Sequence, residues 1–532
     1  MKQLSPIDSI FVYNEQSNTP LHISPIMIYD PSTAENGFVR FKDILETFRS
    51  RLQLSPVFRR KLVKVPLNLD SPYWVEDEDF DLEFHVRHIA LPKPGDWRQF
   101  HILLARLHSR PVDLSRPPWE AYVIEGLDNI EGLPPGCFAM YMKIHHSAID
   151  GATGNQIVEA LHDPSPVPGD FRKEDNWEPE ASPGTLTMLS HAYFNLLKQP
   201  SKIFNLVKHT IESLDLPTEI GQKRDEMEDH GIKDITRFNH EVSPHRVFGA
   251  VPFELDRLKV IKNAIGGCTL NDVILSITSG AMRCYLAAHD ELPESSLIAG
   301  VPMSTRSSDD IDASGGNSVS GMRISLRTDI ADPVERLKKI NKDAVASKVY
   351  ANAVGARRLV NIAESIPSSV AALGMRVVAA TGLSSRMPMI HTIVTNVPGP
   401  QVPIYMCGAK GLLWLGAGVL IDGMGLFTTI NSYNGKLSIA FISDRAMMPD
   451  PEFYEECIRE SYRDLENVAL KSGIAANAKT VRKKTSRKKT SRKKTSRKKT
   501  SRKKTTSKKT TSKKITGKKT ARKKTNRRKK AG

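Results

Sequence analysis

Apolar residues recur at two spacings along residues 1–163, and the alternation between them predicts strands interleaved with helices. The clearest strand is 138–144, where the even positions form one apolar row. Helical spacing marks Phe38 to Leu52 and Trp97 to Leu107, and another helical pattern follows Gly151. This pattern is typical of a mixed α/β fold.

The second half of the chain repeats the alternation. Thr269 and Asp272 have the spacing of a helix cap, so a structural use of Asp272 is expected. A proline-glycine turn, Thr395 to Pro400, is expected after a strand at 392–394. Helices are also predicted at Asp256 to Ala264, from the cap at Thr269 to Leu286, and at Pro451 to Leu470. Strands are predicted at Leu297 to Val301, at Val319 to Leu326 and between Leu412 and Ile442.

The composition changes between the two halves. Residues 164–183 are dense in proline, glycine and charge, which is typical of a surface crossover. Leu186 to Leu214 is helical in spacing and fairly apolar, and it either packs on the protein body, the favoured interpretation, or rests on lipid. The sequence therefore predicts a first domain at 1–180 and a second domain at 248–472. A linker with a helix joins them at 181–247, and a tail follows at 473–532.

The tail dominates the charge of the chain. The formal net charge is +18, but 29 Lys and Arg residues lie between Lys479 and Gly532, where there is no Asp or Glu. The remainder holds 48 basic and 59 acidic residues, a balance of −11. Near-repeated pentamers such as Ser486 to Thr490 contain almost no apolar side chains, so we expect a disordered tail.

The tail has no aromatic residue on which a base could stack. Non-specific nucleic-acid binding through residues 479–532 would therefore depend on phosphate charge. Anionic lipid is an equal candidate partner, and a solvated tail without a dedicated partner is the third interpretation.

Several common signatures are missing. Met1 to Pro6 lacks the apolar run of a signal peptide, and no window offers about 18 uncharged apolar residues for a membrane span. The five cysteines are widely spaced, which suits buried thiols in a reducing cytoplasm. No GxSxG, Walker A or GxGxxG motif supports a hydrolase, kinase or dehydrogenase.

The candidate chemistry lies in His145 to Gly151, HHSAIDG, between the strand at 138–144 and the helical pattern that follows. A neutral imidazole can accept and return a proton near neutral pH. Consecutive residues of an extended chain point in opposite directions, so one histidine should be structural and the other should face a cleft. A metal site is the alternative, but HExxH is absent and adjacent histidines rarely converge on one ion.

HHxxxDG resembles the active-site motif of the coenzyme A-dependent acyltransferase superfamily, which includes chloramphenicol acetyltransferases and condensation domains of peptide synthetases. Further motifs, in order, resemble the bacterial wax ester synthase/diacylglycerol acyltransferase family over about residues 1–470. They are Leu4 to Asp8, Pro20 to His22, Pro117 to Glu120, Asn271-Asp272, Pro302 to Arg306, Gly316-Asn317 and Thr395 to Pro400. Pro118 stands where the family usually has Leu, and Thr395 where it usually has Ser.

The resemblance implies two chloramphenicol-acetyltransferase-like domains with the histidines in a tunnel between them. It implies acyl transfer from acyl-coenzyme A to diacylglycerol or a long-chain alcohol, with no bound cofactor or metal. The implied roles are His146 as general base, His145 in orientation and Asp150 as a buried carboxylate paired with Arg306. Asn271 and Gly151 are candidates for oxyanion stabilisation or substrate positioning.

Two other function classes share parts of this pattern. A condensation-type acyltransferase with a non-lipid acceptor would use the same base, and a polyanion-binding protein would act through the tail. With the lipid acceptors implied by the resemblance, we expect a cytoplasmic enzyme peripherally attached to the inner face of the membrane or to lipid droplets.

Overall fold

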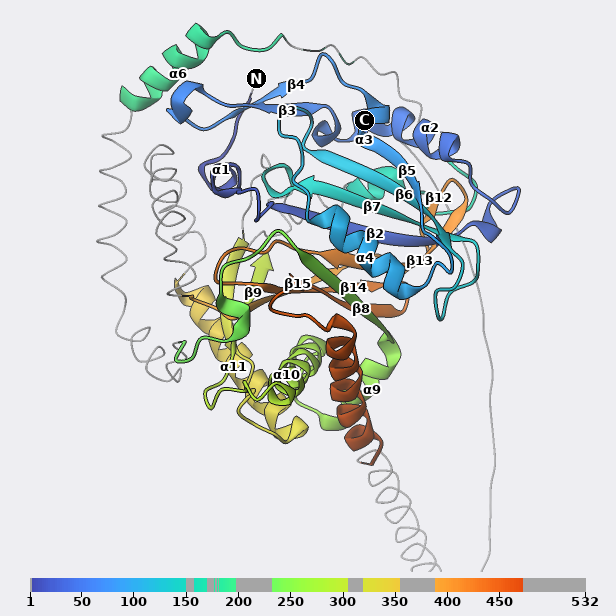
Figure 1. Cartoon of the computed structure of the whole chain (residues 1–532), viewed down its shortest axis with the longest axis vertical. Helices are drawn as coiled ribbons and strands as arrows, with labels where there is room; N and C mark the ends of the chain where they lie inside the picture. The colour runs from blue at the N-terminus through green and yellow to red at the C-terminus, as the bar shows by residue number, and fades with distance from the viewer. Residues whose placement is uncertain are drawn as a thin grey trace, which may run out of the picture. The chain divides into compact units, whose positions relative to one another are not determined.

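A computed structural model describes residues 2–149, 157–169, 177, 179, 181–197, 232–304, 319–354 and 388–471. Two six-stranded sheets and one three-stranded sheet, together with helices, make a mixed α/β fold, as predicted (Figure 1). The chain divides after Ser472, and the predicted disordered tail, 473–532, lies outside the described residues.

The first large sheet is completed by strands from the second half of the chain. All its neighbouring strands are antiparallel except the pair β5 and β6, which are parallel and joined by a crossover through α4 (Trp97–His108). The sheet order is β12 (Tyr405–Met406), β13 (Ala409–Ala417), β2 (His22–Asp30), β7 (Cys137–His145), β6 (Trp119–Leu127) and β5 (Val86–Ala90). Because β13 pairs with β2, neither half of the sequence forms this sheet alone.

Strand β7 is buried along its whole length. The even residues from Phe138 to Ile144 belong to one hydrophobic cluster, with α2 (Phe41–Arg51) and α3 (Leu82–His85), which confirms the predicted apolar row. The odd residues Ala139 and Tyr141 belong to a second cluster that continues into the other large sheet. Both faces of the strand are therefore covered, which fixes the position of its C-terminal end.

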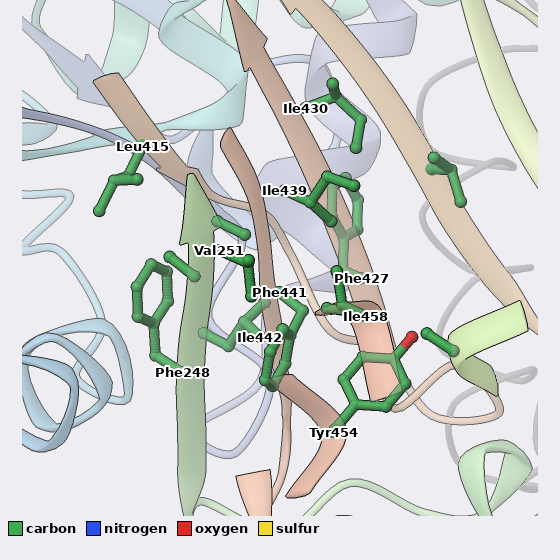
Figure 2. Packing of buried hydrophobic residues seen from close by; sticks show 14 of the residues in the cluster. Phe248, Val251, Leu415, Phe427, Ile430, Ile439, Phe441, Ile442, Tyr454 and Ile458 are labelled. Atoms are coloured by element: carbon green, nitrogen blue, oxygen red, sulfur yellow. The ribbon is translucent and has the colours of Figure 1, made fainter. Parts of the chain in front are cut away.

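The second large sheet carries a layer of helices on the face turned away from the first (Figure 1). These helices are α9 (Leu255–Ile265), α10 (Leu270–Ala288), α11 (Pro333–Val354) and a closing helix at 451–471. The sheet order is β10 (Val319–Ser325), β9 (Ile298–Ser304), β11 (Thr392–Pro398), β14 (Leu426–Tyr433), β15 (Lys436–Asp444) and β8 (Arg246–Glu254). Figure 2 shows Phe441 of β15 packed beside Tyr454 of the closing helix. Their ring centroids lie 4.8 Å apart.

The predicted cap of α10 is present. The Thr269 hydroxyl accepts a hydrogen bond from the backbone N–H of Asp272 (3.2 Å), and the Asp272 carboxylate accepts from the backbone N–H of Thr269 (2.7 Å). Asp272 also accepts a hydrogen bond from the Asn341 amide of α11 (2.8 Å). The structural use of Asp272 is thereby confirmed, and it extends to the packing of two helices.

Two strands extend further than the sequence predicted. Strand β9 continues through Pro302 to Ser304, and β11 continues through Thr395 to Pro398, both into segments expected to be loops. Pro302 pairs with Gly321 of β10, while the pairing of β9 with β11 extends only to Gly300. A proline is tolerated there because one side of the strand acts as an edge.

The three-stranded sheet was not predicted. It contains β1 (Lys2–Gln3), β4 (Tyr73–Glu76) and β3 (Arg60–Val63), with α1 (Pro6–Asn14) and α6 (Thr185–Leu197) beside it. Helix α6 begins one residue before the helix expected at 186–214 and overlaps it to Leu197; the rest of that predicted helix lies outside the described residues. Short 3₁₀ turns complete the fold: η1 (Pro31–Thr33), η2 (Leu52–Leu54), η3 (Pro56–Phe58), η4 (Pro66–Asn68), η5 (His146–Ala148) and η6 (Arg237–Asn239).

In the described ranges, no individual helix combines the length and apolarity that a bilayer crossing requires. Helices α9 and α10 meet that measure only when they are counted together, and they are bent by 98° relative to each other. Residues of α10 from Val273 to Met282 are buried in the protein, which is typical of a core helix.

Candidate active site

The histidine pair lies where β7 ends and η5 begins. The backbone N–H of His145 donates to the carbonyl of Pro118 (2.9 Å), and that of His146 donates to the carbonyl of Leu21 (2.9 Å). Three segments that stood out in the sequence, around residues 20–22, 117–120 and 145–151, therefore meet at these two peptide groups. Main-chain hydrogen bonds to the residues just before both neighbouring strands hold the two histidines in place.

His145 is completely buried. Its Nδ1 lies 2.7 Å from the hydroxyl of Ser147 and accepts a hydrogen bond from the backbone N–H of Ser147 (3.3 Å). Nδ1 is thus the acceptor of the neutral ring, and the proton is assigned to Nε2, which faces Glu15 Oε1 at 3.7 Å. Burial, with a smaller contribution from His146, lowers the pKa of His145 to about 3.

His146 has a different environment. It is only partly buried, and its ring stacks on that of Phe11 with 4.1 Å between centroids and 11° between planes. Phe11 belongs to α1, whose N-cap is Ser5; the Ser5 hydroxyl accepts a hydrogen bond from the backbone N–H of Asp8 (3.0 Å). The N-terminal motif therefore caps the helix that places an aromatic ring on His146.

A buried ion pair between Lys143 of β7 and Glu120 of β6 lies close to the histidines in the sheet. The ammonium group of Lys143 donates to the carbonyl of Arg110 (2.6 Å) and lies 3.6 Å from the carboxylate of Glu120. Burial lowers the pKa of Lys143 to about 8, although Glu120 opposes this shift. Glu120 also accepts a hydrogen bond from Tyr122 (2.7 Å), so its buried charge is compensated from two directions.

Trp119, next to Glu120 in the same motif, is a packing anchor. Its ring is fully buried, its indole N–H donates to the carbonyl of Phe58 (3.0 Å), and it stacks on Phe48 at 5.8 Å. The sequence interpretation of this tryptophan as a core residue is confirmed. Its contribution to the site is to fix the strand that pairs with β7.

Further buried histidines lie near the same strands. His108 of α4 contacts Ser24 through Nδ1 (3.1 Å) and donates from Nε2 to the carbonyl of Gly418 (2.8 Å). Burial lowers its pKa to about 3, and burial also holds the pKa of His22 well below its usual value. His108 acts as a neutral hydrogen-bonding group, whereas neither ring nitrogen of His22 has a hydrogen-bond partner. Sequence spacing alone did not reveal either environment.

The other candidate residues are only partly placed. Asp150, Gly151 and Arg306 lie outside the described residues, so their roles remain predictions. Asn271 is the second residue of α10 and is partly buried. Phe11, Glu15 and Ser147 were not singled out as site residues, although the first two lie close to the motifs at 4–8 and 20–22.

The chemistry available here is proton transfer by one partly exposed imidazole beside a locked neutral one. Among the described residues, no group of three or more His, Cys, Asp or Glu side chains is arranged to hold a metal ion. The five cysteines are free thiols. Burial raises the pKa of Cys137 to about 12 and that of Cys407 to about 11, which makes both poor nucleophiles.

Comparisons with known proteins agree along most of the chain. Residues 4–274 match a family model described as the wax ester synthase/diacylglycerol acyltransferase catalytic domain, and residues 315–466 match the C-terminal domain of the same family. The O-acyltransferase WSD of Acinetobacter baylyi is 30% identical over 483 residues, which cover 88% of this chain and 98% of that protein.

Solved structures show the same likeness. A wax ester synthase/diacylglycerol acyltransferase from Marinobacter aquaeolei VT8 has a TM-score of 0.64 at 25% identity and covers 88% of this chain and 100% of its own. The first condensation domain of the calcium-dependent antibiotic synthetase, in complex with a substrate analogue, has a TM-score of 0.52 at 11% identity. It covers 88% of this chain and 96% of its own. At that identity the second likeness concerns the fold alone.

The buried histidines predict acid sensitivity. His108, His145 and His162 have pKa values of about 3, 3 and 4, while an unfolded histidine titrates near 6.5. Their stabilising contribution is therefore complete above pH 6.5 and is lost progressively as the pH falls from 6.5 toward the folded-state pKa values of about 3 to 4, because the unfolded chain binds more protons. At pH 5 each should cost about 2 kcal/mol of unfolding free energy.

Urea unfolding at pH 7.5, 6 and 5 measures this loss. His162→Gln should reduce the loss of unfolding free energy between pH 7.5 and pH 5 by about 2 kcal/mol, the contribution of one histidine. This difference is independent of the effect of the substitution on stability at pH 7.5. A free energy of unfolding that stays constant between pH 7 and pH 5 would contradict the assignment of these rings as buried and neutral.

Proposed function

We infer, because this chain belongs to the wax ester synthase/diacylglycerol acyltransferase family, that it transfers a fatty acyl group from acyl-coenzyme A to diacylglycerol or to a long-chain alcohol. The observation that supports the reaction type is the histidine pair itself. One member is locked and neutral, and the other stays partly exposed at the end of a rigid strand.

We propose His146 as the general base. His145 is a poor candidate, because its Nδ1 already accepts hydrogen bonds from Ser147 and burial lowers its pKa to about 3. His145 would instead fix the start of η5 and so orient His146. Partial exposure leaves His146 within reach of an acceptor hydroxyl.

The proposed reaction needs no covalent enzyme intermediate. The acceptor oxygen attacks the thioester carbonyl carbon while His146 takes the hydroxyl proton. The resulting oxyanion then collapses, the carbon–sulfur bond breaks, and the imidazolium returns its proton to the thiolate of coenzyme A. Such proton transfer typically contributes about 10²–10⁴ in rate.

Phe11 gives this cycle an electrostatic component. When His146 takes up the proton, a positive charge develops directly over the face of an aromatic ring. A ring face attracts a cation by about 0.5–2 kcal/mol, the larger values applying where water is excluded. We propose Phe11 as a positioning residue that also stabilises the imidazolium.

Four residues complete the proposal. Asp150 would pair with Arg306 and hold the loop after His146, while Asn271 or the backbone at Gly151 would donate to the oxyanion. An oxyanion donor is typically worth roughly 10²–10³ in rate. The tunnel between the two domains likewise remains a prediction from the resemblance.

We further propose peripheral attachment to an anionic membrane or lipid droplet on the cytoplasmic side, with the basic tail as one contact. Its 29 positive charges between Lys479 and Gly532 would hold an otherwise acidic chain near an anionic surface. Non-specific nucleic-acid binding is the competing use of the same charges.

The central test is release of free thiol from palmitoyl-coenzyme A in the presence of diacylglycerol or hexadecanol. His146→Ala should remove nearly all acceptor-dependent release while near-native unfolding behaviour is kept, since the residue is only partly buried. His145→Asn should lower turnover less but reduce stability. Normal turnover in the His146 variant would sink the base assignment, and thiol release only with a non-lipid acceptor such as an amine would sink the substrate class.

Phe11 can be tested through the pH profile. Phe11→Leu should lower kcat about tenfold, since loss of the ring destabilises the imidazolium. For the same reason the acidic limb of kcat should move to lower pH. Phe11→Tyr, which keeps the ring face, serves as the matched control. If Phe11→Leu lowers kcat but leaves the acidic limb in place, the ring only positions His146.

The tail can be tested by truncation after Ser472. Turnover on detergent-dispersed substrate should be unchanged, because the family match ends at residue 466. Binding to phosphatidylglycerol vesicles should weaken, and binding of the full chain should fall steeply with salt. Preference of the full chain for DNA over such vesicles by orders of magnitude, or loss of detergent turnover on truncation, would contradict the proposed membrane contact.

A further inference from the structure

Helix α6 has two apolar faces. On one side Met188 and Ala192 are buried, and Ala192 packs with Val65, Tyr73 and Val75 of the small sheet region. The opposite stripe follows helical spacing and stays in solvent, with Leu186 83% exposed. The rest of this stripe consists of Tyr193, Phe194 and Leu197. A helix that needed only to pack on the protein would be polar on this second side.

The neighbouring turn η4 continues the exposed apolar surface. Leu67 has a φ of 57° and is 87% exposed, and Asn68 follows with a φ of 53°. The left-handed conformation suits asparagine and glycine but is unfavourable for leucine. The chain thus holds a leucine side chain in water at a position where both its backbone and its solvation are unfavourable. Leu69, also exposed, extends the surface.

We call this surface the α6–η4 patch: Leu67, Leu69, Leu186, Tyr193, Phe194 and Leu197. Helix α6 and η4 contact each other. The Asn195 amide donates to the Asp70 carboxylate (2.6 Å), which fixes the helix to the end of the turn. The patch is therefore a built surface and not a set of isolated side chains.

The patch is linked to the proposed base through one helix. The hydroxyl of Tyr13 donates to the carbonyl of Asp70 (2.7 Å), and Tyr13 lies on α1. The same helix carries Phe11, which stacks on His146. A surface that binds the α6–η4 patch would therefore lie close to α1, the helix whose Phe11 stacks on His146.

We propose that the α6–η4 patch inserts into the acyl-chain boundary of a phospholipid surface. This inference rests on the proposed function, since diacylglycerol and long-chain alcohols are dissolved in lipid. Leucine and aromatic side chains on one helix face, with a tyrosine hydroxyl that can remain at the headgroups, are the chemistry of an interfacial anchor. The strained leucine at the tip of η4 supplies a second insertion point.

The test uses the full chain and neutral phosphatidylcholine vesicles, in about 0.5 M NaCl to screen the basic tail. Partitioning is measured by flotation without acyl-coenzyme A. Leu67→Asn should lower the partition coefficient about tenfold, the value of one inserted leucine. The same variant should raise Tm, because asparagine accepts the left-handed backbone. Phe194→Ser should lower partitioning at least as much.

Phe38→Ser is the matched control, since Phe38 is 56% exposed and Phe194 60%, and Phe38 lies in the segment before α2. Its partitioning should equal that of the unchanged protein. Partitioning that is unaltered in both patch variants overturns the proposal. A shift from dimer to monomer in sedimentation of the patch variants, without vesicle binding of the parent, would assign the patch to a second copy instead.

A fall in Tm for Leu67→Asn would make the leucine structural and would also overturn the proposal. Failure of the proposed function is visible separately. Absent thiol release in detergent would refute acyl transfer, whereas vesicle partitioning is measured without turnover.

Discussion

Everything at the candidate site depends on burial of β7 from both faces. Its even residues pack against the outer helices and its odd residues face the core shared with the second sheet. It pairs with a neighbouring strand on both edges, β2 on one and β6 on the other. A strand held in this way cannot slide without exchanging its two apolar rows. The position of the residues at its end, His145 and His146, is therefore fixed. Their backbone N–H groups donate to the carbonyls of Pro118 and Leu21, which lie just before the two neighbouring strands.

Adjacent histidines with opposite environments follow from this constraint. The alternation of an extended chain turns one side chain inward, and desolvation then makes protonation of His145 unfavourable. His146 lies one residue further, where the strand gives way to a 3₁₀ turn, and it keeps partial exposure. The division of roles between a neutral positioning ring and a proposed base thus needs no special residue type. It is produced by where the strand ends.

Local patterns predicted what local forces decide. The apolar row of β7, the amphipathic helix α4 and the Thr269 cap all depend on residues within a few positions of one another, and the structure contains them. The stacking of Phe11 on His146 and the pairing of β13 with β2 depend on segments far apart in the chain, for which periodicity carries no information. The predicted end of the strand at Val301, before Pro302, was wrong for a similar reason. Its place in β9 depends on how far β11 pairs along the other edge.

The proposed basic-tail contact and the α6–η4 patch would act at different ranges. Attraction between the tail and an anionic surface extends over about 8–10 Å at physiological salt and carries no orientation. Burial of leucine and aromatic side chains acts only on contact, but it requires that one face of the protein meets the lipid. The first contact would raise the local concentration of the enzyme, whereas the second would orient it. Because α1 joins the patch region to His146, that orientation would decide whether the proposed base faces the phase in which the acceptor is dissolved.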